Sequence, residues 1–177
     1  SGILTEGRSA TMNAASHELQ AGLAGLLGNE IQFVTGVTSH GTVIAGSTAN
    51  SALVRSLIGS KTINTVNGEG FVIRTAVYNK KKIILIAGNE DTGVLYGVFH
   101  FLQLLQQHKQ IAELNIETSP ATAIRVLNHW DNLDRTVERG YAGFSLWNWH
   151  TLPGYLMQQY TDYARANASV GINGTVF

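Results

Sequence analysis

The sequence contains no cysteine and only two prolines among its 177 residues. Without cysteine, the fold can use neither a disulfide nor a thiolate metal site. Proteins free of cysteine occur in oxidising and reducing compartments alike. This absence therefore leaves both a cytoplasmic and a periplasmic or cell-associated location open.

Net charge is also absent, because 12 Lys and Arg residues balance 12 Asp and Glu residues. A neutral chain has no field to attract nucleic acid or an anionic membrane. The basic run Lys80-Lys81-Lys82 lies between two strand-like segments and is typical of a solvated hairpin turn. No apolar stretch approaches the ~20 residues that a membrane span requires. We therefore expect neither nucleic acid nor a membrane as a partner.

Three segments have apolar residues at helical spacing, at residues 11–27, 50–58 and 90–107. Gly28 and Gly59 follow the first two segments as C-terminal caps, and acidic residues open the third, where they suit a helix N-terminus. Gly97, inside the third helix, predicts close packing of that helix on a sheet, because alanine would otherwise be the better helix former.

Strand-like segments alternate with these helices, at residues 32–34, 42–45, 71–78 and 82–87. The last two are joined by a short polar turn and predict an antiparallel hairpin. Helices alternating with strands predict an α/β sandwich with a mixed sheet.

A short polar segment, residues 116–123, contains Pro120 and predicts a domain boundary. We assign residues 1–118 to the α/β sandwich and residues 119–177 to a second domain. In the second domain a strand from Ile124 is followed by a long loop, a helix from Pro153 and another strand. We interpret this order as the first β/α unit of a truncated (β/α)8 barrel, which we expect cannot close on itself.

The loop at residues 128–149 combines aromatic, amide and charged side chains at unusual density. In a β/α barrel, the loop after a strand faces the active site. Aromatic rings stack on the C–H faces of sugars, while carboxylates, amides and arginines bind the hydroxyl groups. The composition of this loop therefore favours a sugar-binding wall.

Two stretches of this loop, Asn-His-Trp-Asp-Asn-Leu-Asp at 128–134 and Val-Glu-Arg-Gly-Tyr-Ala-Gly at 137–143, resemble glycoside hydrolase family 67, the α-glucuronidases. They are similar to that family's first barrel strand and the loop after it. Residues 160–174 continue the similarity, and residues 93–99 resemble the last helix of the family's N-terminal domain. The resemblance extends over essentially the whole chain.

The resemblance implies a hydrolase that releases 4-O-methylglucuronic acid from xylan or xylooligosaccharides with inversion, without metal or cofactor. It places the general acid and base on later barrel strands, so we expect no catalytic residue in this chain and no activity from it alone. It also implies that Trp130, Glu138 and Arg139 contact a glucuronoxylan-derived oligosaccharide. The intact enzyme could form a homodimer.

Alternative roles exist for several of these residues. Trp130 could instead be a core residue, and Glu138 could form an ion pair with Arg139 that shapes the loop. His129 is more typical of a hydrogen-bonded structural histidine than of a metal ligand, because no second ligand stands at helical spacing.

Two further points stay open from the residues. Trp147 and Trp149 are typical of packing residues, although one of them could reach the xylan-binding cleft. The alternative for the whole chain is a non-catalytic α/β module that binds carbohydrate or protein.

Overall fold

The computed structural model describes residues 2–59 and 66–177. The predicted strands, hairpin and three N-terminal helices lie in these ranges, and residues 60–65 fall outside them. By their internal contacts the residues form two compact units, residues 1–121 and residues 122–177.

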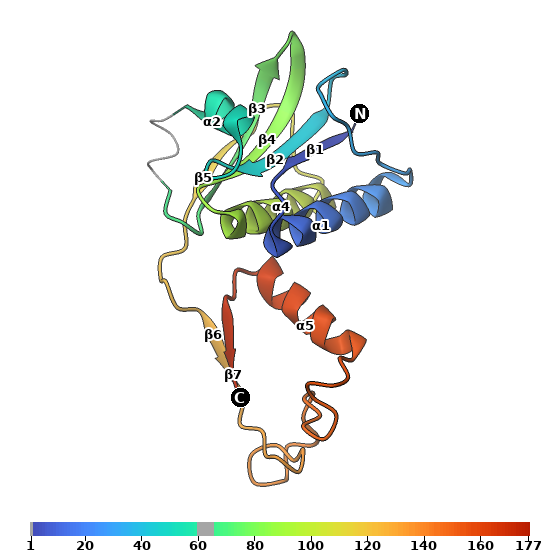
Figure 1. Cartoon of the computed structure of the whole chain (residues 1–177), viewed down its shortest axis with the longest axis vertical. Helices are drawn as coiled ribbons and strands as arrows, with labels where there is room; N and C mark the ends of the chain where they lie inside the picture. Colours follow the sequence, from blue (N-terminus) through green and yellow to red (C-terminus); the bar gives the residue numbers. More distant parts are fainter. Residues whose placement is uncertain (1, 60–65) are drawn as a thin grey trace. The chain divides into compact units, whose positions relative to one another are not determined.

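Unit 1 is built on a five-stranded mixed sheet in the order β1-β2-β4-β3-β5 (Figure 1). Its strands are β1 (Ile3–Glu6), β2 (Thr42–Ser47), β3 (Phe71–Tyr78), β4 (Lys81–Gly88) and β5 (Asn115–Thr118). β1, β2 and β4 run parallel, whereas β3 pairs antiparallel with both β4 and β5. The prediction of an α/β fold with a mixed sheet is confirmed.

The predicted hairpin is confirmed in the pairing of β3 with β4. Its turn consists of Asn79 and Lys80, which both adopt a left-handed backbone, with φ of 48° and 63°. Two consecutive left-handed residues match the right-handed twist of paired strands. The lysine run therefore begins in the turn and continues into β4.

Two strands were not predicted, and one predicted strand is wrong. β1 has only four residues and is held by parallel pairing with β2. β5 overlaps the start of the polar segment, residues 116–123, that we interpreted as a domain boundary. Residues 32–34 form only an isolated bridge from Phe33 to Ile3. Strands this short depend on their neighbours more than on their own sequence pattern.

The three predicted helices of unit 1 are confirmed as α1 (Ala10–Leu27), α2 (Ala52–Ile58) and α4 (Asp91–Gln106). Figure 1 shows α1 and α4 on one face of the sheet and α2 on the other. Gly28 ends α1 in a left-handed conformation, with φ of 67°, as predicted for a C-terminal cap. Leu26 and Leu27, which continue the helical spacing of apolar residues in α1, are 41% and 56% exposed because they follow the last buried turn.

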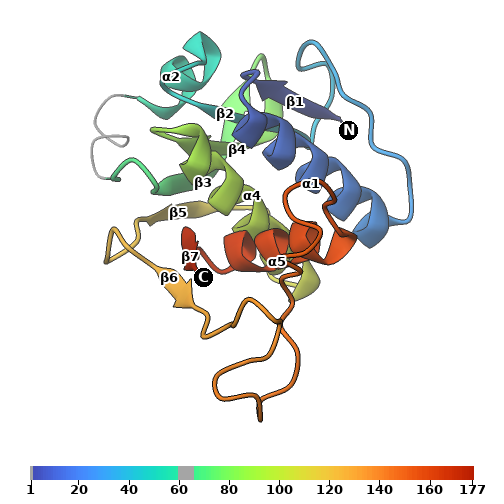
Figure 2. The same ribbon diagram turned by 60° about the horizontal axis from the view of Figure 1, so that its bottom comes forward.

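Two glycines allow close packing of these helices. A Cβ atom on Gly97 of α4 would lie 2.8 Å from Ile86 in β4, which confirms the predicted contact of this helix with the sheet. A Cβ atom on Gly22 of α1 would lie 2.6 Å from Leu102 of α4. α1 and α4 accordingly run side by side (Figure 2).

The side chain of Asp91 connects the N-termini of α1 and α4, at the C-terminal end of the parallel strands. Asp91, the first residue of α4, accepts hydrogen bonds from Ser9 at 2.6 Å, Ser47 at 2.5 Å and Asn50 at 3.1 Å. Burial raises the pKa of Asp91, but the hydrogen bonds from Ser47, Ser9 and Asn50 outweigh it and leave the pKa lowered. Ser9 is also the N-cap of α1, so one carboxylate joins two helices to β2.

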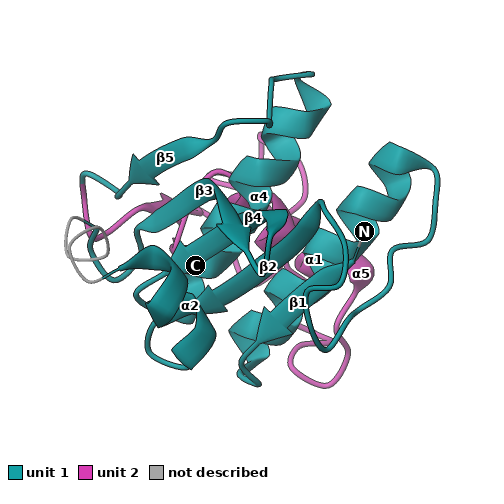
Figure 3. Ribbon diagram, turned by 90° about the horizontal axis from the view of Figure 1, so that it is seen from above, with its two compact units in different colours: residues 1–121 teal, residues 122–177 magenta. Residues whose placement is uncertain are grey.

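Unit 2 contains β6 (Val126–Asn128), α5 (Gln158–Ser169) and β7 (Gly174–Val176) (Figure 3). β6 and β7 form a two-stranded parallel sheet, with α5 between them in sequence. The predicted helix start at Pro153 is wrong, because the helix begins at Gln158. Tyr155 and Leu156, which lie in the predicted helix, precede the observed one and are 63% and 70% exposed.

Candidate sugar-binding site

The candidate site lies at the carboxyl end of the paired strands of unit 2. The backbone amide of His129 donates to the carbonyl of Val176 at 2.9 Å, which extends the pairing of β6 and β7 by one hydrogen bond. The long loop thus leaves β6 at the same end of the sheet where Phe177 follows β7. This is the end at which parallel β/α folds place their ligand-binding loops.

The first half of this loop, residues 129–145, is folded back on itself by its own hydrogen bonds. Isolated bridges join Asp131 to Val137 and Thr136 to Phe144. The side chain of Asn132 donates to the carbonyl of Glu138 at 2.7 Å and to the Thr136 hydroxyl at 2.9 Å. The loop therefore has a defined shape without belonging to a helix or a sheet.

The reversals of this loop require left-handed backbone at four positions. Arg135 and Glu138 have φ of 73° and 55°, while Gly140 and Gly143 have φ of 91° and 88°. Non-glycine residues seldom adopt this conformation unless their surroundings enforce it. At Glu138 the enforcing contact is the hydrogen bond from its amide to the carbonyl of Trp130, at 2.7 Å.

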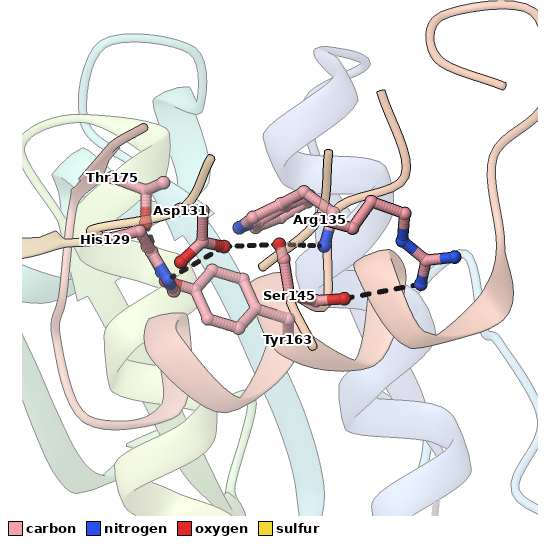
Figure 4. Close-up of polar contacts among 7 residues, drawn as sticks. His129, Asp131, Arg135, Ser145, Tyr163 and Thr175 are labelled. Atoms are coloured by element: carbon pink, nitrogen blue, oxygen red, sulfur yellow. Dashed lines mark hydrogen bonds and ion pairs between the residues drawn. The ribbon is translucent and has the colours of Figure 1, made fainter. Parts of the chain in front are cut away.

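A polar network anchors both neighbours of Trp130 (Figure 4). His129 Nε2 and the Tyr163 hydroxyl are 2.6 Å apart, and that hydroxyl lies 2.7 Å from Thr175 Oγ1. The Asp131 side chain, only 5% exposed, accepts a hydrogen bond from Ser145 and lies 4.0 Å from His129 Nδ1. The prediction of a hydrogen-bonded structural histidine at 129 is confirmed.

Beside this network lies an aromatic cluster centred on Trp147, which is 8% exposed. Its ring stacks on Tyr160 at 5.0 Å between centroids and meets Tyr163 and Phe177 edge-on at 5.2 and 4.4 Å. Trp149 also meets Phe177 edge-on, at 5.6 Å. Both tryptophan rings thus pack against Phe177, which is the packing role that the sequence favours for them.

Trp130 differs from these two tryptophans, since 66% of its surface is exposed. It lines a cavity of about 440 Å³ together with His129, Asp131, Asn132, Glu138, Arg139 and Phe177. The loop thus brings Trp130, Glu138 and Arg139 to one cavity. The exposed indole argues against a core role for Trp130 within unit 2.

Glu138 and Arg139 do not form the ion pair that was one alternative for them. The carboxylate of Glu138 instead accepts a hydrogen bond from the Tyr141 hydroxyl, and this bond raises the pKa of Tyr141. Arg139 is exposed and makes no hydrogen bond or ion pair with any residue that the structure describes. Its guanidinium is therefore available to an anionic ligand.

The three loop carboxylates are all engaged within the loop. Asp131 accepts from Ser145, Glu138 accepts from Tyr141, and Asp134 accepts from Thr136. The hydrogen bonds from the Thr136 hydroxyl and amide lower the pKa of Asp134. A general acid requires a raised pKa, so Asp134 is shifted in the wrong direction for that role.

Several residues of this site carry no signal in the sequence. Ser145 and Tyr163 reach the network from distant positions, and nothing in their spacing links them to Asp131 or His129.

In residues 2–59 and 66–177, no group of three or more His, Asp or Glu side chains is placed to hold a metal ion. No helix in these ranges is long and apolar enough to cross a membrane.

Comparison with known families matches both parts of the chain to one family. The model described as "Glycosyl hydrolase family 67 N-terminus" matches residues 1–101. The model described as "Glycosyl hydrolase family 67 middle domain" matches residues 104–177.

Curated relatives agree with this match. A probable alpha-glucuronidase A of Aspergillus fumigatus is 31% identical over 174 residues, which cover 98% of this chain and 20% of the relative. Alpha-glucuronidase A of Emericella nidulans is 36% identical over 98 residues, or 52% of this chain and 12% of the relative. The chain spans about a fifth of the length of the first of these relatives.

Solved structures of glycoside hydrolases share the fold. A family GH115 4-O-methyl-α-glucuronidase with specificity for decorated arabinogalactans has a TM-score of 0.64 at 14% identity, over 98% of this chain and 25% of that one. A GH20 exo-β-N-acetylglucosaminidase from Vibrio harveyi has a TM-score of 0.56 at 13% identity, over 98% and 21%. At these identities the likeness is one of fold alone.

Proposed function

We infer the function from the family, since this chain belongs to glycosyl hydrolase family 67. We propose that it forms about a fifth of an inverting α-glucuronidase, which releases 4-O-methylglucuronic acid from xylan-derived oligosaccharides. The observation that carries this proposal is the match of both family models along the chain, supported by relatives named alpha-glucuronidase.

Within that enzyme, residues 1–118 would be the N-terminal α/β sandwich domain and residues 119–177 the start of a (β/α)8 barrel. The parallel pair β6 and β7, with α5 between them in sequence, supports the barrel assignment. The ring N–H groups of Trp147 and Trp149 support it too, because they are buried without an acceptor in the described ranges. Buried donors are seldom left unpaired, and the rest of a barrel would supply acceptors.

The cavity beside Trp130 would hold the glucuronate. Trp130 offers an exposed aromatic face for the C–H surface of the sugar ring. The guanidinium of Arg139 would form an ion pair with the carboxylate of the sugar, because arginine can donate two parallel hydrogen bonds to a carboxylate. The Glu138 carboxylate would accept hydrogen bonds from sugar hydroxyls while the Tyr141 hydroxyl holds it in place.

The hydrolytic step would use groups outside this chain. Inversion requires a general acid and a general base separated by ~6.5–9.5 Å, with room for a water between them. The three carboxylates of the loop already accept hydrogen bonds within the loop, and the pKa of Asp134 is lowered. We therefore propose that Trp130, Glu138 and Arg139 bind substrate and that no catalytic residue lies in residues 1–177.

The test combines an activity assay and a binding assay on the 177-residue chain. With 4-O-methylglucuronosyl xylotriose we expect no release of glucuronic acid, but saturable NMR shifts at the Trp130 indole and the Arg139 side chain. Arg139→Gln should raise Kd about tenfold, because the variant loses a charge-assisted hydrogen bond to the ligand. Arg165→Gln on α5 is the matched control and should leave binding unchanged.

Two results would contradict this assignment. Release of glucuronic acid that is abolished by Glu138→Gln would place the hydrolytic chemistry in this chain. Equal loss of binding in the Arg139 and Arg165 variants would show that general charge, and not the cavity beside Trp130, attracts the sugar acid.

A further inference from the structure

A second cavity lies in unit 1, on the α1 face of the sheet. It has a volume of about 340 Å³ and is lined by Thr5, Gly7, Asn13, Ser16, His17, Gln20 and Phe33. Four of these residues, Asn13, Ser16, His17 and Gln20, follow the spacing i, i+3, i+4, i+7 on α1. They therefore form one polar stripe along a single face of the helix.

Phe33 forms the opposite side of this groove. Its bridge to Ile3 is held by the Ile3 amide, which donates to the Gln32 carbonyl at 3.0 Å, and by the Val34 amide, which donates to the Ile3 carbonyl at 2.8 Å. Since bridged residues point to the same face of a sheet, Phe33 lies on the face of Ile3 and Thr5. Its ring is nevertheless 48% exposed.

The two sides of the groove are tied together. The Gln20 side chain donates from its amide nitrogen to the carbonyl of Ile31 at 2.8 Å, which connects α1 to the segment that carries Phe33. With the backbone bonds to Ile3, this contact fixes the distance between the polar stripe and the aromatic ring. A groove held in this way is formed before a ligand arrives, which lowers the entropic cost of binding.

The side chains that line the groove indicate which class of ligand it binds. An exposed aromatic ring faces two amides, two hydroxyls and an imidazole, and the lining includes no Asp, Glu, Lys or Arg. Aromatic rings offer the apolar contact, and amides and hydroxyls both donate to and accept from sugar hydroxyls. Without a cation, the groove has nothing to pair with a glucuronate carboxylate. The combination of one aromatic ring with amides, hydroxyls and an imidazole therefore favours a neutral sugar.

We propose that this groove binds an unsubstituted xylosyl segment of a xylan chain, apart from the glucuronate cavity. The neutral-sugar class follows from the lining, whereas the choice of xylose rests on the proposed function. The groove volume lies at the lower end of the range for ligand sites, which suits a short oligosaccharide.

The experiment is an NMR titration of the 177-residue chain with xylotetraose, which carries no glucuronate. We expect saturable shifts of the amides of Asn13, Gln20 and Phe33. Phe33→Ala should raise Kd about three- to tenfold through the loss of one stacked ring. Asn13→Ala should raise Kd as well and keeps the helix intact, because alanine favours helix more than asparagine does.

Leu27→Ala is the control, since Leu27 is an apolar residue at the far end of α1, outside the groove, and has an exposed fraction (56%) similar to that of Phe33 (48%). It should leave Kd unchanged. Absence of saturable shifts at the groove, or an unchanged Kd in both Phe33→Ala and Asn13→Ala, would overturn the proposal.

Failure of this proposal is distinguishable from failure of the proposed function. Xylotetraose binding at the groove without glucuronate binding beside Trp130 would refute the glucuronidase site and leave the groove as a neutral-sugar site. Glucuronate binding beside Trp130 without xylotetraose binding at the groove would refute the groove alone.

Discussion

The two units of this chain hold their strands in different ways. In unit 1 the central strands are almost fully buried, and Ile73, Leu85 and Ile86 have no exposed surface. In unit 2 all three residues of β6 are exposed, and Val126 and Leu127 retain 44% and 39% of their surface. Unit 1 therefore depends on an apolar core, whereas unit 2 depends on an aromatic cluster and on polar contacts around His129 and Asp131.

Each unit is vulnerable to a different kind of substitution. An apolar core is damaged by cavities, because the surrounding side chains relax only partly into the lost volume. A polar network is damaged when one partner is removed, because the remaining buried group loses its hydrogen bond.

Leu85→Ala in β4 should reduce the stability of unit 1 by about 2–5 kcal/mol. The matched change in unit 2, Leu127→Ala in β6, should cost less than about 1 kcal/mol, because Leu127 already contacts water. Urea unfolding followed by amide hydrogen exchange in each unit measures both. Equal losses in the two variants would show that β6 is as buried in solution as β4.

Asp131→Ala should reduce the stability of unit 2 by about 2–3 kcal/mol, because it leaves Ser145 without its acceptor in a buried position. Near-ultraviolet circular dichroism of Trp147 reports the change. Asp162→Ala is the control, since the exposed pair of Asp162 with Arg165 is worth under about 0.5 kcal/mol. Equal losses of stability in the two variants would show that the polar network of unit 2 does not stabilise the fold.

Asp91 should make the stability of unit 1 depend on acid pH. Its pKa is lowered in the folded state, so its contribution is present above the unfolded value of about 3.9 and is lost as pH falls below that value. Asp91→Asn should flatten this loss by at most about 1 kcal/mol, because the group is only partly buried. Hydrogen exchange of unit 1 between pH 5 and pH 2 tests this. A steeper loss in the variant would reverse the sign of the effect.

Much of unit 1 could be predicted from the sequence because its signals are local. The apolar spacing and the terminal Gly28 place α1 to within one residue. The strand-like composition of residues 71–78 and 82–87 and the polar turn between them place the hairpin. β1 could not be predicted, because Ile3–Glu6 becomes a strand only through its parallel pairing with β2.

Less of unit 2 could be predicted, because its contacts join residues that are distant in sequence. The density of aromatic and charged residues marked the loop, and the family resemblance singled out Trp130, Glu138 and Arg139. No pattern indicated that Ser145 would bind Asp131, or that Tyr163 would bind His129. These contacts depend on left-handed backbone at Arg135 and Glu138, which are not residue types that favour it.

Trp130 is proposed to bind the sugar and to contribute little to the stability of the fold. The most direct test is Trp130→Ala in a full-length family 67 enzyme that carries this chain, with the melting temperature and kcat/KM measured on one preparation. Loss of a large binding anchor costs ~2–4 kcal/mol, so kcat/KM should fall on the order of tens to a thousandfold. The melting temperature should stay nearly unchanged, whereas Trp147→Ala, which removes the buried ring, should lower it clearly. A Trp130→Ala enzyme that is destabilised but kinetically normal would contradict the account.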